Sequence, residues 1–174
     1  RWGGDLSVFE GLSRPEFTEL FLRAYNDWVI DNVNLADGRI RLVGIVPTRS
    51  DTSEMIATAT RLVNAGVRAV YLQADVPPGG VAPSHSMLDP LWRLFEDHDV
   101  AVTLHIGTEF FFLDPGWTVA ETLLDLFQSP EIPNATIQLF STVHMALDNY
   151  VSAMVLGGVF ERFPRLRLRL MEVG

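Results

Sequence analysis

Apolar side chains recur along this chain in two alternating rhythms. One is a helical spacing of three and four residues, which first appears after Ser13-Arg14-Pro15-Glu16, a stretch with the spacing of a capping box. This rhythm predicts helices over 14–32, 51–65, 87–97, 118–128 and 145–163. The other rhythm is a short run of mostly apolar, β-prone residues. It predicts strands over 40–46, 67–72, 100–105 and 166–171, and a further strand-like segment over 135–140.

Strands and helices alternate along the whole sequence, which predicts an α/β fold. The strands lie far enough apart for a crossover helix between each pair, so we expect them to run parallel in one sheet with the helices on its outer face. A doubly wound sheet and a (β/α) barrel both fit this alternation. The sequence has no glycine-rich G-x-G-x-x-G or G-x-x-x-x-G-K-[ST] fingerprint, which makes a nucleotide-binding sheet the weaker alternative.

Composition narrows the class of partner. The chain has 174 residues, of which 48% are hydrophobic and 20% charged, so a sizeable core is expected. Its net charge of −9 disfavours binding to nucleic acid or to an anionic membrane. There is no cysteine, which excludes disulfides and thiolate metal sites. No apolar run approaches the roughly 20 residues of a membrane span. The absence of cysteine and of a membrane span allows a cytoplasmic protein, and this is the location that we expect.

One predicted strand ends in a side chain that is a candidate functional residue. The run over 100–105 ends in His105, and the chain then turns at Gly107. The carboxyl ends of parallel strands are where α/β proteins bind ligands. A histidine there can hold a metal or transfer protons. The alternative is a histidine that is simply hydrogen-bonded at the edge of the sheet.

Three stretches carry a resemblance to a known family. Asp89–Trp92 (DPLW) precedes the strand that leads to His105 and Gly107, Gly157–Arg167 reads GGVFERFPRLR, and Leu170–Gly174 reads LMEVG. Together they resemble the amidohydrolase-related family, in the branch that contains aminocarboxymuconate-semialdehyde decarboxylase and related aromatic-acid decarboxylases. The resemblance covers about residues 39–174.

This resemblance implies a (β/α)8 TIM-type barrel with a divalent metal, zinc or manganese, at the carboxyl ends of its strands. A complete barrel needs about 250 residues. We therefore expect residues 1–174 to form a single, incomplete barrel domain, about strands three to six, within a longer protein. The family's first strand carries an H-x-H or E-x-H ligand pair, which this chain lacks because His85, His98, His105 and His144 stand alone. The metal site is therefore expected to be incomplete in this chain.

The resemblance also assigns roles to particular residues. His105 matches a metal ligand, and Glu172 stands where other members have histidine and is expected to be catalytic, as a base or as a group that orients the attacking water. We expect Gln73, after the strand over 67–72, and His85, in a loop rich in Pro and Gly, to bind substrate. Strict alternation predicts that Leu168, Leu170 and Glu172 share the inner face of the barrel, with Glu172 near His105.

The resulting hypothesis is an enzyme. We expect a metal-dependent decarboxylase or hydrolase that acts on a small carboxylate-bearing substrate, aromatic acids included, in a homo-oligomer. The alternative is a catalytically inactive, truncated half-barrel that serves in assembly. Half a barrel has open sheet edges, which proteins normally cover.

Overall fold

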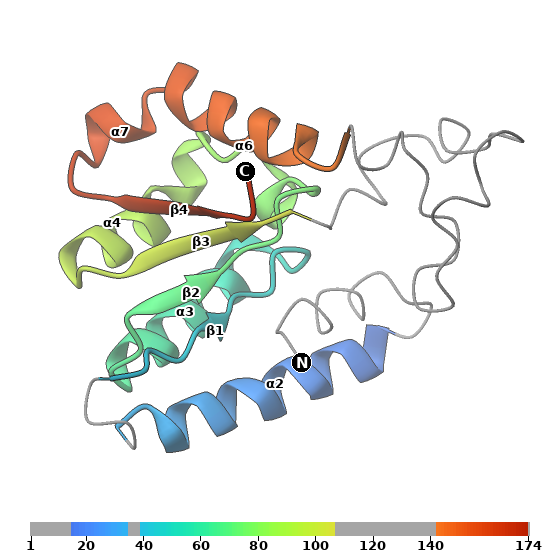
Figure 1. Cartoon of the computed structure of the whole chain (residues 1–174), viewed down its shortest axis with the longest axis vertical. Helices are drawn as coiled ribbons and strands as arrows, with labels where there is room; N and C mark the ends of the chain where they lie inside the picture. Colours follow the sequence, from blue (N-terminus) through green and yellow to red (C-terminus); the bar gives the residue numbers. More distant parts are fainter. Residues whose placement is uncertain (1–14, 35–38, 107–141, 174) are drawn as a thin grey trace, which may run out of the picture.

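A parallel sheet of four strands organises the chain (Figure 1). The computed structural model describes residues 15–34, 39–106 and 142–173. The strands are β1 (Gly44–Ile45), β2 (Ala69–Tyr71), β3 (Ala101–His105) and β4 (Arg167–Met171), and their order in the sheet is β1-β2-β3-β4. All three neighbouring pairs are parallel. The four predicted strands are confirmed, in shortened form. The predicted helix over 118–128 and strand-like segment over 135–140 lie outside the described residues.

Most helices lie close to the residue ranges predicted for them. They are α2 (Pro15–Asn32), α3 (Thr52–Asn64), α4 (Asp89–Asp97), α6 (Met145–Leu156) and α7 (Val159–Arg162), with short 3-10 turns η1 (Pro78–Gly80) and η2 (Ser86–Leu88). Helix α3 begins where the Asp51 carboxylate accepts a hydrogen bond from the backbone N–H of Glu54, at 2.9 Å. In the described part of the chain, no helix combines the length and apolarity needed to cross a bilayer.

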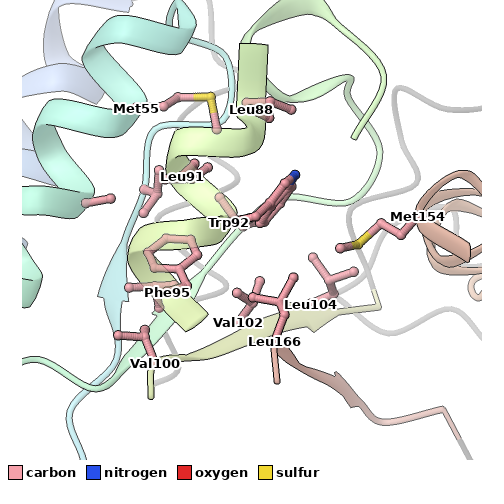
Figure 2. Packing of buried hydrophobic residues seen from close by; sticks show 14 of the residues in the cluster. Met55, Leu88, Leu91, Trp92, Phe95, Val100, Val102, Leu104, Met154 and Leu166 are labelled. Atoms are coloured by element: carbon pink, nitrogen blue, oxygen red, sulfur yellow. The ribbon is translucent and has the colours of Figure 1, made fainter. Parts of the chain in front are cut away.

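The main core lies between the sheet and the helices α3, α4 and α6. Strands β2 and β3 direct Val70, Leu72, Val102 and Leu104 into it, every second residue of each strand. Helix α4 packs on the core side of β3, and Trp92 projects from the middle of this helix into the core (Figure 2). Trp92 is fully buried, and its indole N–H donates to the backbone carbonyl of Pro83 at 2.9 Å, so its polar atom is satisfied.

The predicted single helix over 145–163 is wrong, because the chain breaks at two glycines between α6 and α7. A side chain at Gly157 would overlap Ser84, and Gly158 has a φ of 69°, which glycine adopts without strain. Arg162 then closes the break. Its guanidinium donates to the carbonyls of Gly157 (2.9 Å) and Ser84 (2.9 Å) and to the carboxylate of Asp89 (3.1 Å). Two of the three stretches that carry the resemblance are therefore joined in space.

Helix α2 lies along the outer edge of β1, not on the outer face with the other helices, so the prediction for its packing is wrong. The Asn26 side chain donates to the carbonyl of Ile45 (2.8 Å) and accepts from its N–H (2.9 Å), as a neighbouring strand would. Leu22 packs with Ile45 and Tyr71 on the inner face, while Val29 reaches the main core. The edge position arises because β1 presents backbone groups that need partners.

The faces of β4 are the reverse of those predicted. In register, Leu168 pairs with Val102 and Leu170 with Leu104, and parallel neighbours in register share a face. Leu168 accordingly packs against the main core, so the expectation that Leu168 and Leu170 point inward is wrong. The inner face takes the arginines instead. Arg167 tolerates this face because its guanidinium reaches the carboxylate of Asp99 at 2.6 Å, and Arg169 because it is exposed.

Candidate active site

The carboxyl ends of the four strands bring polar side chains to one edge of the sheet. Arg49 follows β1, Gln73 and Asp75 follow β2, His105 ends β3, and Glu172 follows β4. Because all four strands are parallel, these ends meet on the same side. Thr103 and His105 occupy the face of β3 opposite to the main core, as alternation predicts.

His105 and Glu172 form the centre of this edge. The Nε2 atom of His105 lies 3.7 Å from the Oε2 atom of Glu172, so the two side chains are close together, as predicted. The predicted reason was different. Strict alternation would send Glu172 to the core side with Leu168 and Leu170, but Glu172 has a φ of 61°, in the left-handed region. This one residue turns the chain out of the strand and brings the carboxylate to the histidine.

The ring of His105 is oriented by its own backbone. Its Nδ1 atom lies 2.5 Å from the carbonyl oxygen of Ile106, and a carbonyl can only accept, so Nδ1 carries the proton. In the neutral tautomer with the proton on Nδ1, Nε2 carries the lone pair that binds a metal. A backbone carbonyl on one ring nitrogen is the arrangement that commonly orients a metal-binding histidine.

The chemistry of the two donors fits the metal that the resemblance implies. An imidazole nitrogen and a carboxylate oxygen are ligands that zinc accepts, and manganese accepts both as well. A catalytic zinc site needs three protein ligands. Across residues 15–34, 39–106 and 142–173, no group of three or more histidine, cysteine or acidic side chains is placed to hold a metal. His105 therefore fits as one ligand of a metal site, and the Glu172 carboxylate lies beside it.

Gln73 lies on the inner side of the same edge with its carboxamide unsatisfied. Its side chain is 2% exposed, and its Oε1 atom is buried without a hydrogen-bond partner. Its backbone N–H donates to the Thr48 hydroxyl at 2.9 Å, which ties the end of β2 to the end of β1. Tyr71 pairs with Thr103, so the register carried on by two residues sets Gln73 level with His105. A buried polar group without a partner is costly, and the Oε1 atom of Gln73 is such a group.

Sequence reasoning missed an ion pair beside Gln73. The Asp75 side chain is completely buried, and its Oδ2 lies 3.8 Å from the Nη2 of Arg49, whose side chain is one-third exposed. Asp75 lies in a bend beyond the end of β2, so strand alternation gave no signal for its burial. For Arg49, the only signal in the sequence was its position two residues after Pro47, which follows β1.

His85 has a local structural role. It is exposed, and its Nδ1 atom accepts a hydrogen bond from the backbone N–H of Met87 at 3.1 Å, which caps η2. Its assignment to substrate binding stays a prediction.

Comparison with known proteins agrees with this architecture. The profile of an amidohydrolase family, Amidohydro_2, matches residues 4–174. An amidohydrolase from Mycobacterium avium subsp. paratuberculosis is similar in structure with a TM-score of 0.63 at 19% identity, over 86% of this chain and 37% of its own. An IDCase from Metarhizium anisopliae, a decarboxylase, gives a TM-score of 0.61 at 18% identity, over 86% of this chain and 36% of its own.

The chain thus spans a little over a third of the length of these two proteins. At such identities the likeness establishes the fold, and no curated protein matches the sequence. The parallel four-stranded sheet is consistent with part of a TIM-type barrel. Since the family profile covers nearly all of its length, the chain belongs to the amidohydrolase family.

Proposed function

We propose that the intact protein is a metal-dependent decarboxylase or hydrolase that acts on a small carboxylate-bearing substrate, aromatic acids included. Family membership supports the coarse class, and the IDCase neighbour supports the decarboxylase branch of it. The observation that carries the proposal is the approach of His105 Nε2 to Glu172 Oε2, at 3.7 Å, on the ends of adjacent parallel strands. Zinc and manganese are the proposed metals.

Each residue of the edge has a separate proposed task. His105 holds the metal through Nε2, because its Nδ1 is engaged by the carbonyl of Ile106. A bound divalent metal supplies Lewis-acid chemistry, polarising a substrate oxygen or activating water. Glu172 is 64% exposed at its side chain, so it can take or return a proton at its carboxylate and orient the attacking water. Gln73 offers its unsatisfied carboxamide to the substrate.

The test is the metal content of the intact protein, measured by mass spectrometry after dialysis. We expect His105→Ala to lose most of its metal and all turnover. Glu172→Gln is expected to keep the metal and lose turnover, because the amide keeps the shape but cannot accept the proton. His98→Ala is the matched control, since His98 is exposed and its Nδ1 atom lies 3.0 Å from the carbonyl oxygen of Leu94, in the turn of its own helix.

Full metal loading in His105→Ala would show that His105 is a structural histidine, and the proposal would fall. If the wild-type protein itself holds no metal and turns over no carboxylate, the inactive half-barrel that serves in assembly becomes the better explanation. A homo-oligomer and a cytoplasmic location stay predictions.

A further inference from the structure

The inner face of the sheet carries a positively charged side chain close to His105. Arg169 is in the middle of β4, and its register partner on the neighbouring strand β3 is Thr103 (Figure 1). His105 follows two residues later on the same face of β3, where it pairs with Met171. With strands about 4.8 Å apart and a rise of about 3.3 Å per residue, the Cα atoms of Arg169 and His105 are about 8 Å apart. A small molecule on this face can therefore contact both side chains.

The charge of Arg169 is not neutralised by a neighbouring acid. Arg167, which precedes it on the same face of β4, is paired with the Asp99 carboxylate at 2.6 Å. Arg169 is exposed, and in the part of the chain that the structure describes its guanidinium has no ion pair or hydrogen bond. Glu172 is the nearest acid along the chain, and its carboxylate approaches the His105 ring instead. The face beside His105 therefore keeps one unpaired positive charge among the described residues.

Thr103 adds a neutral hydrogen-bond donor beside Arg169. It is partly exposed, and its hydroxyl has no hydrogen-bond partner among the described residues. A guanidinium carries five N–H donors in a rigid planar fork, which matches the two oxygens of a carboxylate. Register partners on neighbouring strands are about 4.8 Å apart, so the fork and the hydroxyl can donate to the same carboxylate. The donor set fits an anion with two oxygens.

Enclosure of this face makes an anion necessary. The sheet is consistent with part of a TIM-type barrel, in which the inner side chains of the strands fill the interior. A guanidinium that is removed from water without a partner carries a large desolvation cost, so buried charges are paired. In the described part of the chain, no acid pairs with Arg169. The partner then comes from a ligand or from another part of the intact protein, and the experiment below distinguishes these two sources.

We propose that Arg169, together with the Thr103 hydroxyl, binds a carboxylate of the substrate on the inner face of the sheet, with the rest of the molecule extending toward His105 and Glu172. The ligand class is a small carboxylate, short enough to lie between Arg169 and His105, such as an acid with one aromatic ring. This proposal rests on the proposed function, and it adds which side chains recognise the carboxylate and how they orient the molecule.

The experiment measures binding to the intact protein after treatment with EDTA, so that no metal contributes. Isothermal titration calorimetry compares benzoate with benzamide, which has the same shape and no charge. We expect wild type to bind benzoate about tenfold more tightly than benzamide, as a charge-assisted bidentate bond implies. Arg169→Gln should remove this preference, and Arg169→Lys should keep only part of it because the fork is lost. Thr103→Val should weaken benzoate binding by about threefold, the effect of one hydrogen bond.

Arg41→Gln is the matched control. Arg41 is also exposed and without an ion pair among the described residues, but it precedes β1 and so lies toward the amino end of the sheet, away from His105. This variant removes the same charge and should bind benzoate as wild type does. Thermal unfolding of each variant verifies that it is folded.

Equal benzoate affinity in wild type and Arg169→Gln would overturn the inference. No measurable benzoate binding, or equal affinity for benzoate and benzamide in wild type, would also overturn it and would assign the anion to an acid of the intact protein. Benzoate that binds only after metal is restored, and is lost in His105→Ala but not in Arg169→Gln, would place the carboxylate on the metal. That result would reject the role of Arg169 and leave the proposed function intact. Absence of metal in the wild-type protein would instead count against the proposed function.

Discussion

Glu172 offers a direct test of how the site is built, because its backbone is in a conformation that non-glycine residues avoid. Its φ of 61° brings the carboxylate to His105. Replacing Glu172 by glycine or by alanine removes the carboxylate equally in both variants. The two variants differ only in the cost of the left-handed backbone, so the comparison isolates that cost.

The expected difference follows from two opposing terms. A left-handed conformation costs a residue with a Cβ about 1–2 kcal/mol, and glycine avoids it. Glycine loses more backbone entropy on folding, which costs about 0.5–1 kcal/mol relative to alanine. We therefore expect Glu172→Gly to be more stable than Glu172→Ala by about 1 kcal/mol, or about 2–4 °C in Tm for a chain of this size.

The assay is thermal and urea unfolding of both variants in one buffer. The same pair at Met171 is the control, because Met171 is the last residue of β4 and has ordinary strand geometry. There we expect the reverse order, with alanine more stable than glycine. If alanine is as stable as glycine at position 172, the backbone is not left-handed there, and the explanation for the His105–Glu172 contact is wrong.

Three further predictions concern stability. Tyr150→Phe should stabilise the protein by about 1 kcal/mol in urea unfolding, because the Tyr150 hydroxyl is fully buried without a partner and burial raises the pKa of its phenol; a loss of stability would reveal a hidden partner. Gly157→Ala should cost about 2 kcal/mol or more, since the new Cβ would lie 2.6 Å from a carbonyl of α6 and overlap the facing serine; an unchanged urea midpoint would refute this packing. The pKa of Asp51 is lowered by its hydrogen bonds to the Ser53 side chain and to the N–H of Glu54, so the stability it provides is present above its unfolded pKa and is lost as pH falls through the folded value; Asp51→Asn should flatten this part of the pH–stability profile, and an identical profile would count against the cap.

Periodicity was sufficient to predict the parallel strands and most helices, because it depends on burial of one face against a continuous core. The strand leading to His105 shows this well, with Val102 and Leu104 buried and Thr103 and His105 on the other face, as alternation along a strand requires. The position of His105 and Glu172 at the carboxyl ends of their strands also predicted that they lie close together, since parallel strands end at one edge of the sheet.

The errors came from features that periodicity does not contain. Alternation of Leu168 and Leu170 identified a shared face but not its direction, because at an edge strand arginines can lie on the inner side with their charges at the surface. The direction of Glu172 depended on a single dihedral angle. The edge position of α2 depended on the unpaired backbone of Ile45, which Asn26 satisfies, and only the assembled sheet reveals that need.

The contact between Arg162 and Asp89 shows which part of the fold the recognisable stretches of the sequence serve. These two residues belong to separate stretches that make the chain recognisable, yet both belong to a joint between helices rather than to the edge that carries His105. The joint therefore serves the stability of the scaffold, while the side chains at the strand ends set the chemistry, which one scaffold can carry in many forms. Glu172 is a residue of that second kind, because it is exposed at its side chain and lies beside His105, so a substitution there changes the chemistry of the edge and leaves the joint intact.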